Sequence, residues 1–247
     1  MRIGVADYGM NVWEGGACFD WEDRLAQLLR IGYAGIERLT AANGEHALQA
    51  AARARRLGAD FATVRAATQE LSIQYTAALG KAYVWTHAEA KDFDAFCRQV
   101  RHQADVCERW GVRVALHNHM GTPVEKQAEL ESFLEACPSC LLILDTAHLA
   151  AMRGDPVEIA ATYADRLAAL HLKDWLEVEP DSPQWTKRVR FCELGAGLLG
   201  RANADALREA VKRGFDGWAF VEQDAHSRSP LLDLKASRQF LRRETGY

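Results

Sequence analysis

The sequence lacks any long hydrophobic run. Its longest apolar stretches, such as residues 141–144, have the length of one strand, whereas a membrane-spanning helix needs about 18 or more apolar residues in a row. Residues 1–9 also lack the basic segment, apolar core and small-residue cleavage site of a secretory leader. We therefore expect a cytoplasmic protein with no membrane partner.

The sequence also lacks a large excess of charge of either sign. The chain of 247 residues carries 30 basic and 34 acidic side chains, which gives a formal net charge of -4. This balance supplies no general positive field, so nonspecific binding to nucleic acid or to an anionic membrane is not expected. An acidic substrate would need a local basic patch on such a protein. The hydrophobic content of 49% also excludes a disordered chain.

Cysteine-based sites have little support. Among six cysteines only Cys137 and Cys140 form a C-x-x-C pair, and no second pair or histidine pair completes a structural zinc site. The pair precedes a predicted strand rather than opening a helix, which disfavours a redox site. No G-x-S-x-G sequence is present, and no cysteine stands at a predicted strand end beside a histidine. We expect mostly reduced thiols and no serine or cysteine nucleophile.

The chain does contain an uninterrupted alternation of short apolar runs with longer amphipathic segments. The apolar runs predict eight strands, at residues 3–6, 35–39, 61–65, 82–86, 112–117, 141–145, 167–172 and 218–222. The amphipathic segments predict eight helices, at residues 21–31, 45–57, 69–79, 92–110, 124–137, 156–163, 203–213 and 231–243. Glycines such as Gly58 and Gly214 follow several of these helices, as a left-handed closing residue should.

Eight strand and helix units in a chain of this length predict an α/β fold. We expect a single (β/α)8 TIM barrel over residues 1–247, with the active site at the C-terminal ends of the strands. No break in composition marks a linker between two domains. An open doubly wound sheet is the alternative, although it normally uses fewer strands. Residues 176–191 are polar and contain Pro180 and Pro183, so they are expected to form a loop over the barrel mouth.

Polar side chains gather at the predicted C-terminal strand ends. Five of the eight histidines lie there, together with carboxylates on the second, sixth and eighth strands. Because a closed barrel brings these ends toward one axis, burying so many polar groups without partners would be costly. A divalent cation would remove that cost, and carboxylates combined with imidazoles suit Mn²⁺, Zn²⁺, Fe²⁺ or Co²⁺ better than Ca²⁺.

Several segments together make the chain resemble the xylose isomerase-like TIM-barrel superfamily, which includes sugar phosphate isomerases and epimerases and shares its fold with AP endonucleases. They are residues 32–37 (GYAGIE), 117–119 (HNH), 144–148 (LDTAH), 154–156 (GDP), 171–174 (HLKD), 193–197 (ELGAG) and Glu222. In that family strands five to eight hold one metal, which implies the ligands His117, Asp145, His171 and Glu222. The resemblance implies Mn²⁺ first, with Zn²⁺, Co²⁺, Fe²⁺ or Mg²⁺ as alternatives.

The narrower resemblance is to the inosose dehydratase branch, which removes water from a keto-cyclitol. It rests on residues 117–122 (HNHMGT), Glu125 and residues 222–224 (EQD). His117 stands where the sugar epimerases usually carry a glutamate that binds metal and moves a proton. The resemblance implies a small sugar, keto-sugar or cyclitol as substrate, with isomerisation, epimerisation or dehydration as the outcome. It also leaves a homo-oligomer open.

The chemistry common to these branches removes a proton next to a carbonyl, and the metal lowers the cost of the resulting enediolate. Glu222, His119 or His148 would take the proton. Lys173 would stabilise the oxyanion, or would instead pair with Asp174.

Substrate contacts are expected at the barrel mouth, from Glu37, Trp13, His87, Trp175 and Glu193. The two tryptophans could stack on the apolar face of a sugar ring. Glu37 could instead form an ion pair with Arg38 or Arg65. The sequence contains no clear phosphate cradle, which favours a non-phosphorylated sugar or cyclitol.

The sequence also bears on three other interpretations. AP endonucleases carry an Asp-x-His pair just before their Gly-x-Gly motif, and here the positions hold Val189, Arg190 and Phe191, so a nuclease is disfavoured. Residues 195–200 (GAGLLG) match a dinucleotide fingerprint but follow a polar loop late in the chain, which predicts a turn before the next helix. A catalytically inactive sugar-binding or scaffold barrel is the alternative to an enzyme.

Overall fold

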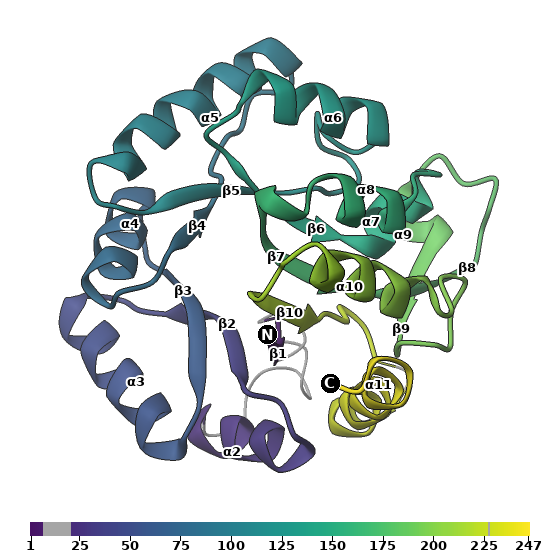
Figure 1. Ribbon diagram of the computed structural model, residues 1–247, viewed down its shortest axis with the longest axis horizontal. Coiled ribbons are helices and arrows are strands. Elements are labelled where there is room, and N and C mark those ends of the chain that lie inside the picture. Colours follow the sequence, from purple (N-terminus) through teal and green to yellow (C-terminus); the bar gives the residue numbers. More distant parts are fainter. Residues whose placement is uncertain (7–20, 227) are drawn as a thin grey trace.

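The computed structural model describes residues 1–6, 21–226 and 228–247. At its centre, parallel strands form an eight-stranded sheet that curls into a barrel (Figure 1). In hydrogen-bonded order the strands are β3 (Asp60–Arg65), β2 (Gly35–Thr40), β1 (Arg2–Val5), β10 (Trp218–Val221), β7 (Leu167–Leu172), β6 (Leu141–Asp145), β5 (Arg113–His117) and β4 (Tyr83–Trp85). The predicted (β/α)8 TIM barrel is confirmed, and each predicted strand end lies within one residue of the observed end.

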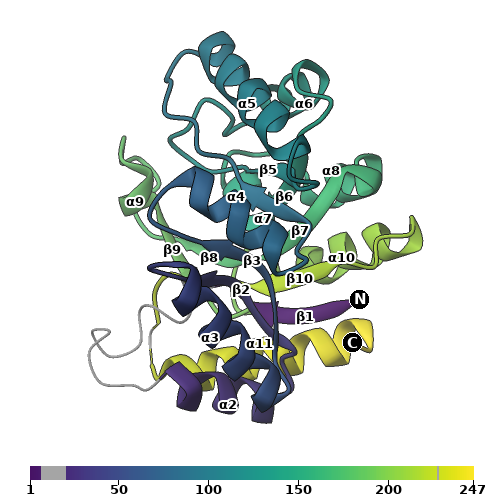
Figure 2. The same ribbon diagram turned by 90° about the vertical axis from the view of Figure 1, so that its left-hand side faces the viewer.

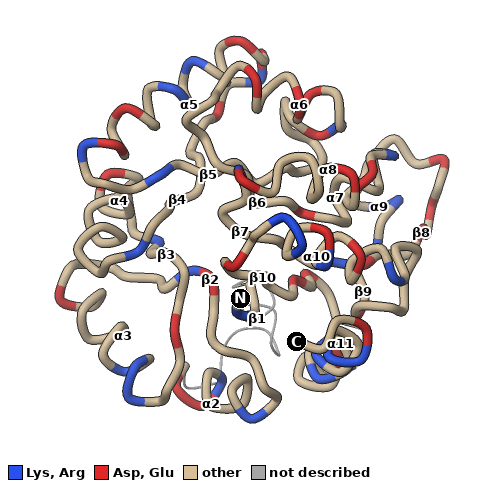
Figure 3. Tube along the Cα trace, viewed as in Figure 1, with Lys and Arg blue, Asp and Glu red and all other residues tan. Residues whose placement is uncertain are grey.

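Helices surround the strands, with acidic and basic residues interspersed along them (Figures 1 and 3). They are α2 (Trp21–Ile31), α3 (Gly44–Leu57), α4 (Gln69–Ala78), α5 (Phe93–Glu108), α6 (Gln127–Ala136), α8 (Pro156–Thr162), α10 (Ala202–Lys212) and α11 (Pro230–Thr245). Asn43, Thr68, Asp92 and Asp155 fix four helix starts by accepting hydrogen bonds from first-turn N–H groups. In the described part of the chain, no helix is long and apolar enough to cross a membrane.

The segment after β7 differs from the predicted open loop over residues 176–191. It contains an antiparallel hairpin and a short helix, namely β8 (Asp174–Glu177), α9 (Trp185–Arg188) and β9 (Val189–Cys192). Trp175 lies opposite Phe191 in the hairpin, and such cross-strand aromatic pairs stabilise a short ladder. The prolines lie in the connection between the two strands. They correctly indicated a turn, but the short strands on either side of that turn were not predicted. Figure 2 shows the hairpin at the end of the barrel where the strands finish, away from both termini.

Inward-facing and outward-facing side chains alternate along the barrel strands. The inward ones form an apolar plug made of Ala6, Ala62, Tyr83, Ala115, Ile143, Ala169, Trp218 and Phe220. On four strands the next inward position toward the C-terminal end is polar. Because side chains two residues apart share a face, these four positions lie just above the plug, and they hold His117, Asp145, His171 and Glu222.

The hydrogen-bonded order of strands ends at β3 and β4, which leaves a seam in the barrel wall between them. Side chains of α4 supply the partners that a neighbouring strand would otherwise give to β3. The backbone N–H of Val64 donates to Thr76 Oγ1 at 3.1 Å, and that of Ala66 donates to Ser72 Oγ at 2.9 Å. Both donors are therefore satisfied without a strand ladder.

The β4 side of the seam is closed in the same way. The carbonyl oxygen of Trp85 accepts hydrogen bonds from Gln69 Nε2 at 2.9 Å and Gln103 Nε2 at 3.1 Å. At the opposite end of the barrel, Lys81 Nζ lies 2.5 Å from Asp60 Oδ1 and ties the start of β4 to the start of β3. Side chains rather than backbone thus close the circle here.

Candidate metal centre at the strand ends

Four side chains that could bind a metal meet at the C-terminal ends of β5, β6, β7 and β10. One nitrogen or oxygen from each of His117, Asp145, His171 and Glu222 lies within 4.8 Å of all the others. His117 is 7% exposed and the other three are buried. These are the four residues that the resemblance implies as ligands.

The spacing of these atoms suits a single ion. His117 Nε2 lies 3.5 Å from Asp145 Oδ2 and 3.8 Å from Glu222 Oε2. Ligand atoms bound at about 2.1 Å to one ion lie at comparable separations from one another. In the described structure, His117 Nε2 and Asp145 Oδ2 are buried and make no hydrogen bond. Buried polar atoms without partners are costly, so the donor set fits a divalent cation.

Backbone contacts hold Asp145 so that only one of its oxygens faces the cluster. Asp145 caps α7 (Thr146–Ala151), because its Oδ1 accepts the backbone N–H of His148 at 2.8 Å. Asn118 bridges β5 and β6: its Nδ2 donates to the carbonyl oxygen of Asp145 at 3.0 Å, and its Oδ1 accepts the N–H of Asp145 at 2.8 Å. Sequence reasoning missed this role of Asn118, and its place between His117 and His119 was the available signal.

Glu37 contacts the opposite side of the His171 ring. Its Oε2 lies 3.0 Å from His171 Nε2, whereas His171 Nδ1 contacts Glu222. A carboxylate beside one ring nitrogen fixes the proton there and leaves the other nitrogen free to bind a metal. Glu37 is fully buried, and its other oxygen accepts hydrogen bonds from Tyr83 Oη at 3.2 Å and Trp85 Nε1 at 2.9 Å.

Charge compensation within the cluster shifts several pKa values. Burial alone would lower the pKa of His171, but Glu37 and Glu222 outweigh it and raise that pKa to about 10. Burial would raise the pKa of Glu222, yet Lys173 and His171 hold it well below its usual range. The pKa of Asp145 is likewise lowered, because nearby positive groups outweigh burial. The cluster therefore keeps its carboxylates ionised, as metal binding requires.

Lys173 is fully buried beside the cluster and does not pair with Asp174. Its Nζ donates to Asp224 Oδ2 at 2.8 Å and lies 3.5 Å from Glu222 Oε1. Burial would lower the pKa of Lys173, but Glu222, Asp145 and Asp224 outweigh it and hold that pKa above its usual value. Lys173 is therefore a fixed positive charge at the site. Asp224, which sequence reasoning did not select as a site residue, holds its ammonium in place.

His148 and His119 pack against each other next to Lys173, with ring centroids 3.7 Å apart and ring planes tilted by 36°. His148 Nε2 lies 3.3 Å from Lys173 Nζ, and His148 Nδ1 accepts the backbone N–H of Met120 at 3.5 Å, so both ring nitrogens face donor groups. Burial, followed by competing charges that include Lys173, lowers the pKa of His148 well below its usual value. His119 Nδ1 donates to the carbonyl oxygen of Met120 at 2.7 Å, which leaves the lone pair on Nε2. The lowered pKa keeps the His148 ring neutral.

Trp85 forms one wall of the cluster. Its indole stacks on the His117 ring with centroids 4.6 Å apart and planes 17° apart. Since its Nε1 also donates to Glu37, Trp85 orients two of the polar groups at once.

Asp174 explains the glycines of the segment 195–200. Its carboxylate accepts backbone N–H groups from Trp175, Gly195, Gly197 and Leu199. A Cβ atom on Gly197 would lie 2.3 Å from Asp174 Oδ1, so only glycine fits this close approach. The segment forms a turn that leads into α10, as the sequence predicted, and the carboxylate fixes that turn at the rim of the mouth.

The predicted substrate contacts lie at several places. Trp13 falls outside the described residues. The His87 side chain is 65% exposed and lines a cavity beside Trp85, away from the cluster. Trp175 packs with Phe191 in the hairpin, and Glu193 lies 2.8 Å from Arg228. These four assignments, like those of Glu37 and of the catalytic residues, stay predictions.

Comparisons with known proteins agree with this architecture. The family model described as xylose isomerase-like TIM barrel matches residues 5–244. An inosose dehydratase of Lactiplantibacillus plantarum is 25% identical over 162 residues, which cover 62% of this chain and 54% of that protein. The chain thus spans about half the length of the curated relatives it matches.

Two solved structures share the fold at low sequence identity. The IolI protein with a bound zinc atom aligns with a TM-score of 0.73 at 15% identity, covering 100% of this chain and 98% of that one. An L-ribulose 3-epimerase aligns with a TM-score of 0.72 at 17% identity, covering 99% and 94%. Since the family model spans almost all of the sequence, the chain belongs to the xylose isomerase-like TIM barrel family.

Proposed function

We propose that the protein is a divalent-metal-dependent enzyme that removes a proton next to the carbonyl of a small hydroxyketone. Sugar isomerases, epimerases and keto-cyclitol dehydratases share this step. The observation that carries the proposal is the convergence of His117, Asp145, His171 and Glu222, whose ligand atoms lie within 4.8 Å of one another. The names of the relatives, an inosose dehydratase and a ribulose epimerase, support the same class of substrate.

The four converging residues would hold one ion, and Glu37 would keep His171 in the tautomer that offers Nδ1. Mn²⁺ is our first choice, because two carboxylates and two imidazoles form a mixed oxygen and nitrogen set. The zinc in the IolI structure supports Zn²⁺ as the main alternative. When bound, such an ion supplies Lewis acidity that polarises a carbonyl and lowers the cost of removing the adjacent proton.

Residues of this chain supply the proton transfers. His119 Nε2 carries a lone pair and is our first candidate for the base, since its Nδ1 is committed to the carbonyl of Met120. His148 and Glu222 are the alternatives, but each already contacts Lys173. The Lys173 ammonium, held by Asp224, stabilises negative charge that develops on a substrate oxygen.

Dehydration of a keto-cyclitol is the outcome we place first among the three, because the inosose dehydratase supports it and the site places a fixed ammonium group beside an imidazole. After proton removal, the electron pair on carbon expels the neighbouring hydroxyl group, which takes the abstracted proton from the base and leaves as water. Isomerisation and epimerisation use the same first step and return the proton instead.

Metal content and proton exchange test the proposal together. We expect about one Mn, Zn, Fe or Co per chain by plasma mass spectrometry on protein purified without chelator. The metal-loaded protein should exchange the carbon-bound proton of inososes or keto-sugars with D₂O. An NMR time course also separates dehydration from isomerisation, because only dehydration consumes the hydroxyl group.

Asp145→Asn should lose both metal and exchange, whereas Asp105→Asn, an exposed position on α5, should lose neither. If the protein holds no metal even after reconstitution, the proposal fails and a non-catalytic sugar-binding barrel takes its place.

A further inference from the structure

Lys173 is the single residue between β7, which ends at Leu172, and β8, which begins at Asp174. Its backbone therefore lies where the barrel wall ends and the hairpin begins. The ladder between β6 and β7 does not include Lys173, because its last pair is Asp145 with His171 and the chain then turns into α7. Two side chains hold the backbone at this point instead.

Thr146 and Asn203 form a closed ring of hydrogen bonds with the backbone of Lys173. The N–H of Lys173 donates to Thr146 Oγ1 at 3.1 Å, and Asn203 Nδ2 donates to the carbonyl oxygen of Lys173 at 3.0 Å. The Thr146 hydroxyl closes the ring by donating to Asn203 Oδ1 at 2.6 Å, its shortest contact. Both backbone polar groups of Lys173 are thus held by side chains from α7 and α10.

The ring is buried, and Asn203 does not serve its own helix. Thr146 and Asn203 have no exposed surface, and Lys173 is 1% exposed. Asn203 lies in the first turn of α10, but the N-cap of that helix is Arg201. Its amide is directed at Lys173 and Thr146, and a buried amide is costly unless such partners satisfy it. The burial of Asn203 is therefore explained by the residue that it holds.

The ammonium end of Lys173 is fixed as well. Its Nζ donates to Asp224 Oδ2 at 2.8 Å and lies 4.0 Å from the ring centroid of Phe191. A lysine side chain has several rotatable bonds, so its charge stays in one place only when both ends are held. A charge stabilises a developing oxyanion most when it is in place beforehand, and a misplacement of about 1 Å can cost about a hundredfold in rate.

We propose that Thr146 and Asn203 are positioning residues, which hold the backbone of Lys173 so that its ammonium is in place when negative charge develops on the substrate. They act through Lys173 alone. This inference rests on the proposed function, because it assigns how the oxyanion-stabilising charge of that site is held. It makes turnover depend on α10, an outer helix that contributes no residue to the metal cluster.

Turnover of 2-keto-myo-inositol, an inosose, by the metal-loaded protein is the first test. Thr146→Val removes the acceptor for the Lys173 N–H and should lower kcat for proton exchange in D₂O about tenfold, while KM changes by less than about twofold. Thr146→Ser keeps the hydroxyl and should hold kcat within about twofold of the wild type.

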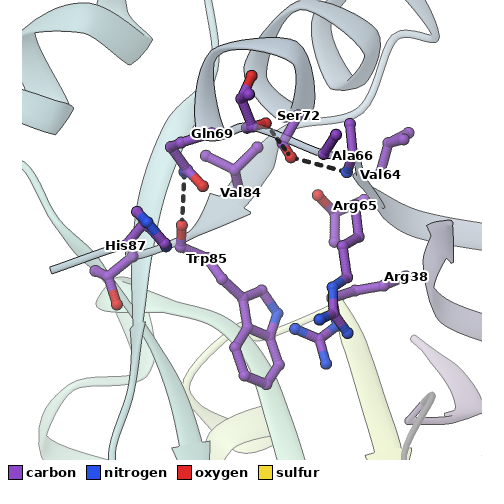
Figure 4. A pocket seen from close by; sticks show the side chains of 13 residues that line it. Arg38, Val64, Arg65, Ala66, Gln69, Ser72, Val84, Trp85 and His87 are labelled. Carbon is purple, nitrogen blue, oxygen red and sulfur yellow. Dashed lines mark hydrogen bonds between the residues drawn. The ribbon is translucent and has the colours of Figure 1, made fainter. Parts of the chain in front are cut away.

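Ser72→Ala is the matched control for the loss of a hydroxyl group. Ser72 Oγ also accepts a backbone N–H, from Ala66 at 2.9 Å, and it lines the cavity at the seam between β3 and β4 (Figure 4). Because this contact does not involve Lys173, its loss should leave kcat unchanged.

A double variant separates positioning from a general structural role. In a Lys173→Met background the ammonium is absent, so adding Thr146→Val or Asn203→Leu should lower kcat by no more than about a further twofold. A loss of about tenfold in both backgrounds would overturn the inference, since the ring would then act independently of Lys173.

Acetylation of Lys173 by acetic anhydride, followed by peptide mass spectrometry, needs no substrate. Because Lys173 is buried, the reagent reaches it only through local opening, which the ring opposes. Thr146→Val and Asn203→Leu should raise the acetylation rate about threefold or more, and Ser72→Ala should not. Unchanged rates in the first two variants would overturn the inference.

The two measurements also distinguish this inference from the proposed function. A wild-type protein that holds its metal but exchanges no proton of the inosose would contradict the proposed function for that substrate. The acetylation rates would still decide whether Thr146 and Asn203 hold Lys173.

Discussion

Glu37 reaches across the barrel mouth from β2 to His171 on β7, with Oε2 3.0 Å from Nε2. The contact leaves Nδ1 of His171 on the side of Glu222. Under the proposed function, Glu37 would act on a metal through the histidine rather than as a ligand itself, because a carboxylate in this place fixes both the ring orientation and the tautomer of a ligand histidine.

Glu37→Gln should weaken metal binding without unfolding the protein. The amide keeps the shape of the side chain but loses the charge that fixes the proton on His171 Nε2. We expect the Kd for Mn²⁺, measured by chelator competition, to rise about tenfold or more. Glu45→Gln, an exposed change on α3, serves as the control. An unchanged Kd would show that His171 is oriented by its other contacts alone.

Lys173→Met should separate metal binding from turnover. The ammonium neutralises carboxylates around it, so its loss leaves the cluster more negative and metal content should not fall. Turnover, followed as proton exchange in D₂O, should drop by about a hundredfold or more, because a charge that stabilises the developing oxyanion is gone. Lys187→Met on α9 is the control. Loss of metal together with activity would instead assign Lys173 a structural role.

Thr76→Val should destabilise the barrel at its seam. The valine keeps the volume but cannot accept the N–H of Val64, which then stays buried without a partner. We expect the free energy of unfolding to fall by about 1–3 kcal/mol in urea titrations. Thr40→Val, at the exposed end of β2, should change it by less than about 0.5 kcal/mol. Equal effects at both positions would mean that α4 does not satisfy the strand edge.

The Asp60 carboxylate should stabilise the folded protein at pH values above its pKa, and this stabilisation should be lost at lower pH. Burial would raise that pKa, but Lys81, the N–H of Phe61 and Arg2 outweigh it and lower the pKa. A carboxyl pKa that folding lowers contributes stability above the unfolded value of about 3.9, and the contribution is lost as pH falls through the folded value. The unfolding free-energy difference between the wild type and Asp60→Asn should hold between about pH 7 and 5 and shrink below about pH 4. A difference that grows on acidification would contradict this assignment.

The barrel could be predicted because its strands and helices are encoded locally. Apolar runs set the strands, and short polar caps such as Thr68 set helix starts, so neither depends on distant partners. The convergence of His117, Asp145, His171 and Glu222 could also be anticipated, since parallel strands deliver their C-terminal ends to one place.

Contacts between side chains of distant elements could not be predicted. Whether Glu37 contacts Arg38 or His171 depends on how far its side chain extends across the barrel interior. The alternation of inward and outward residues along a strand does not specify that distance. The hairpin after β7 was missed because each of its strands has only four residues. The prolines and charged residues around them dominate the local sequence pattern and indicate a loop.

At the seam between β3 and β4, the barrel wall is closed by individual side chains, so a single substitution can alter its closure. Backbone ladders look alike for any sequence, whereas Ser72, Thr76 and Gln69 hold this wall through groups that a single substitution adds or removes. Exchanging them for larger or smaller polar residues would widen or narrow the opening while the other strand pairs keep their registers. Such exchanges would change the shape of this wall without altering the residues of the metal cluster.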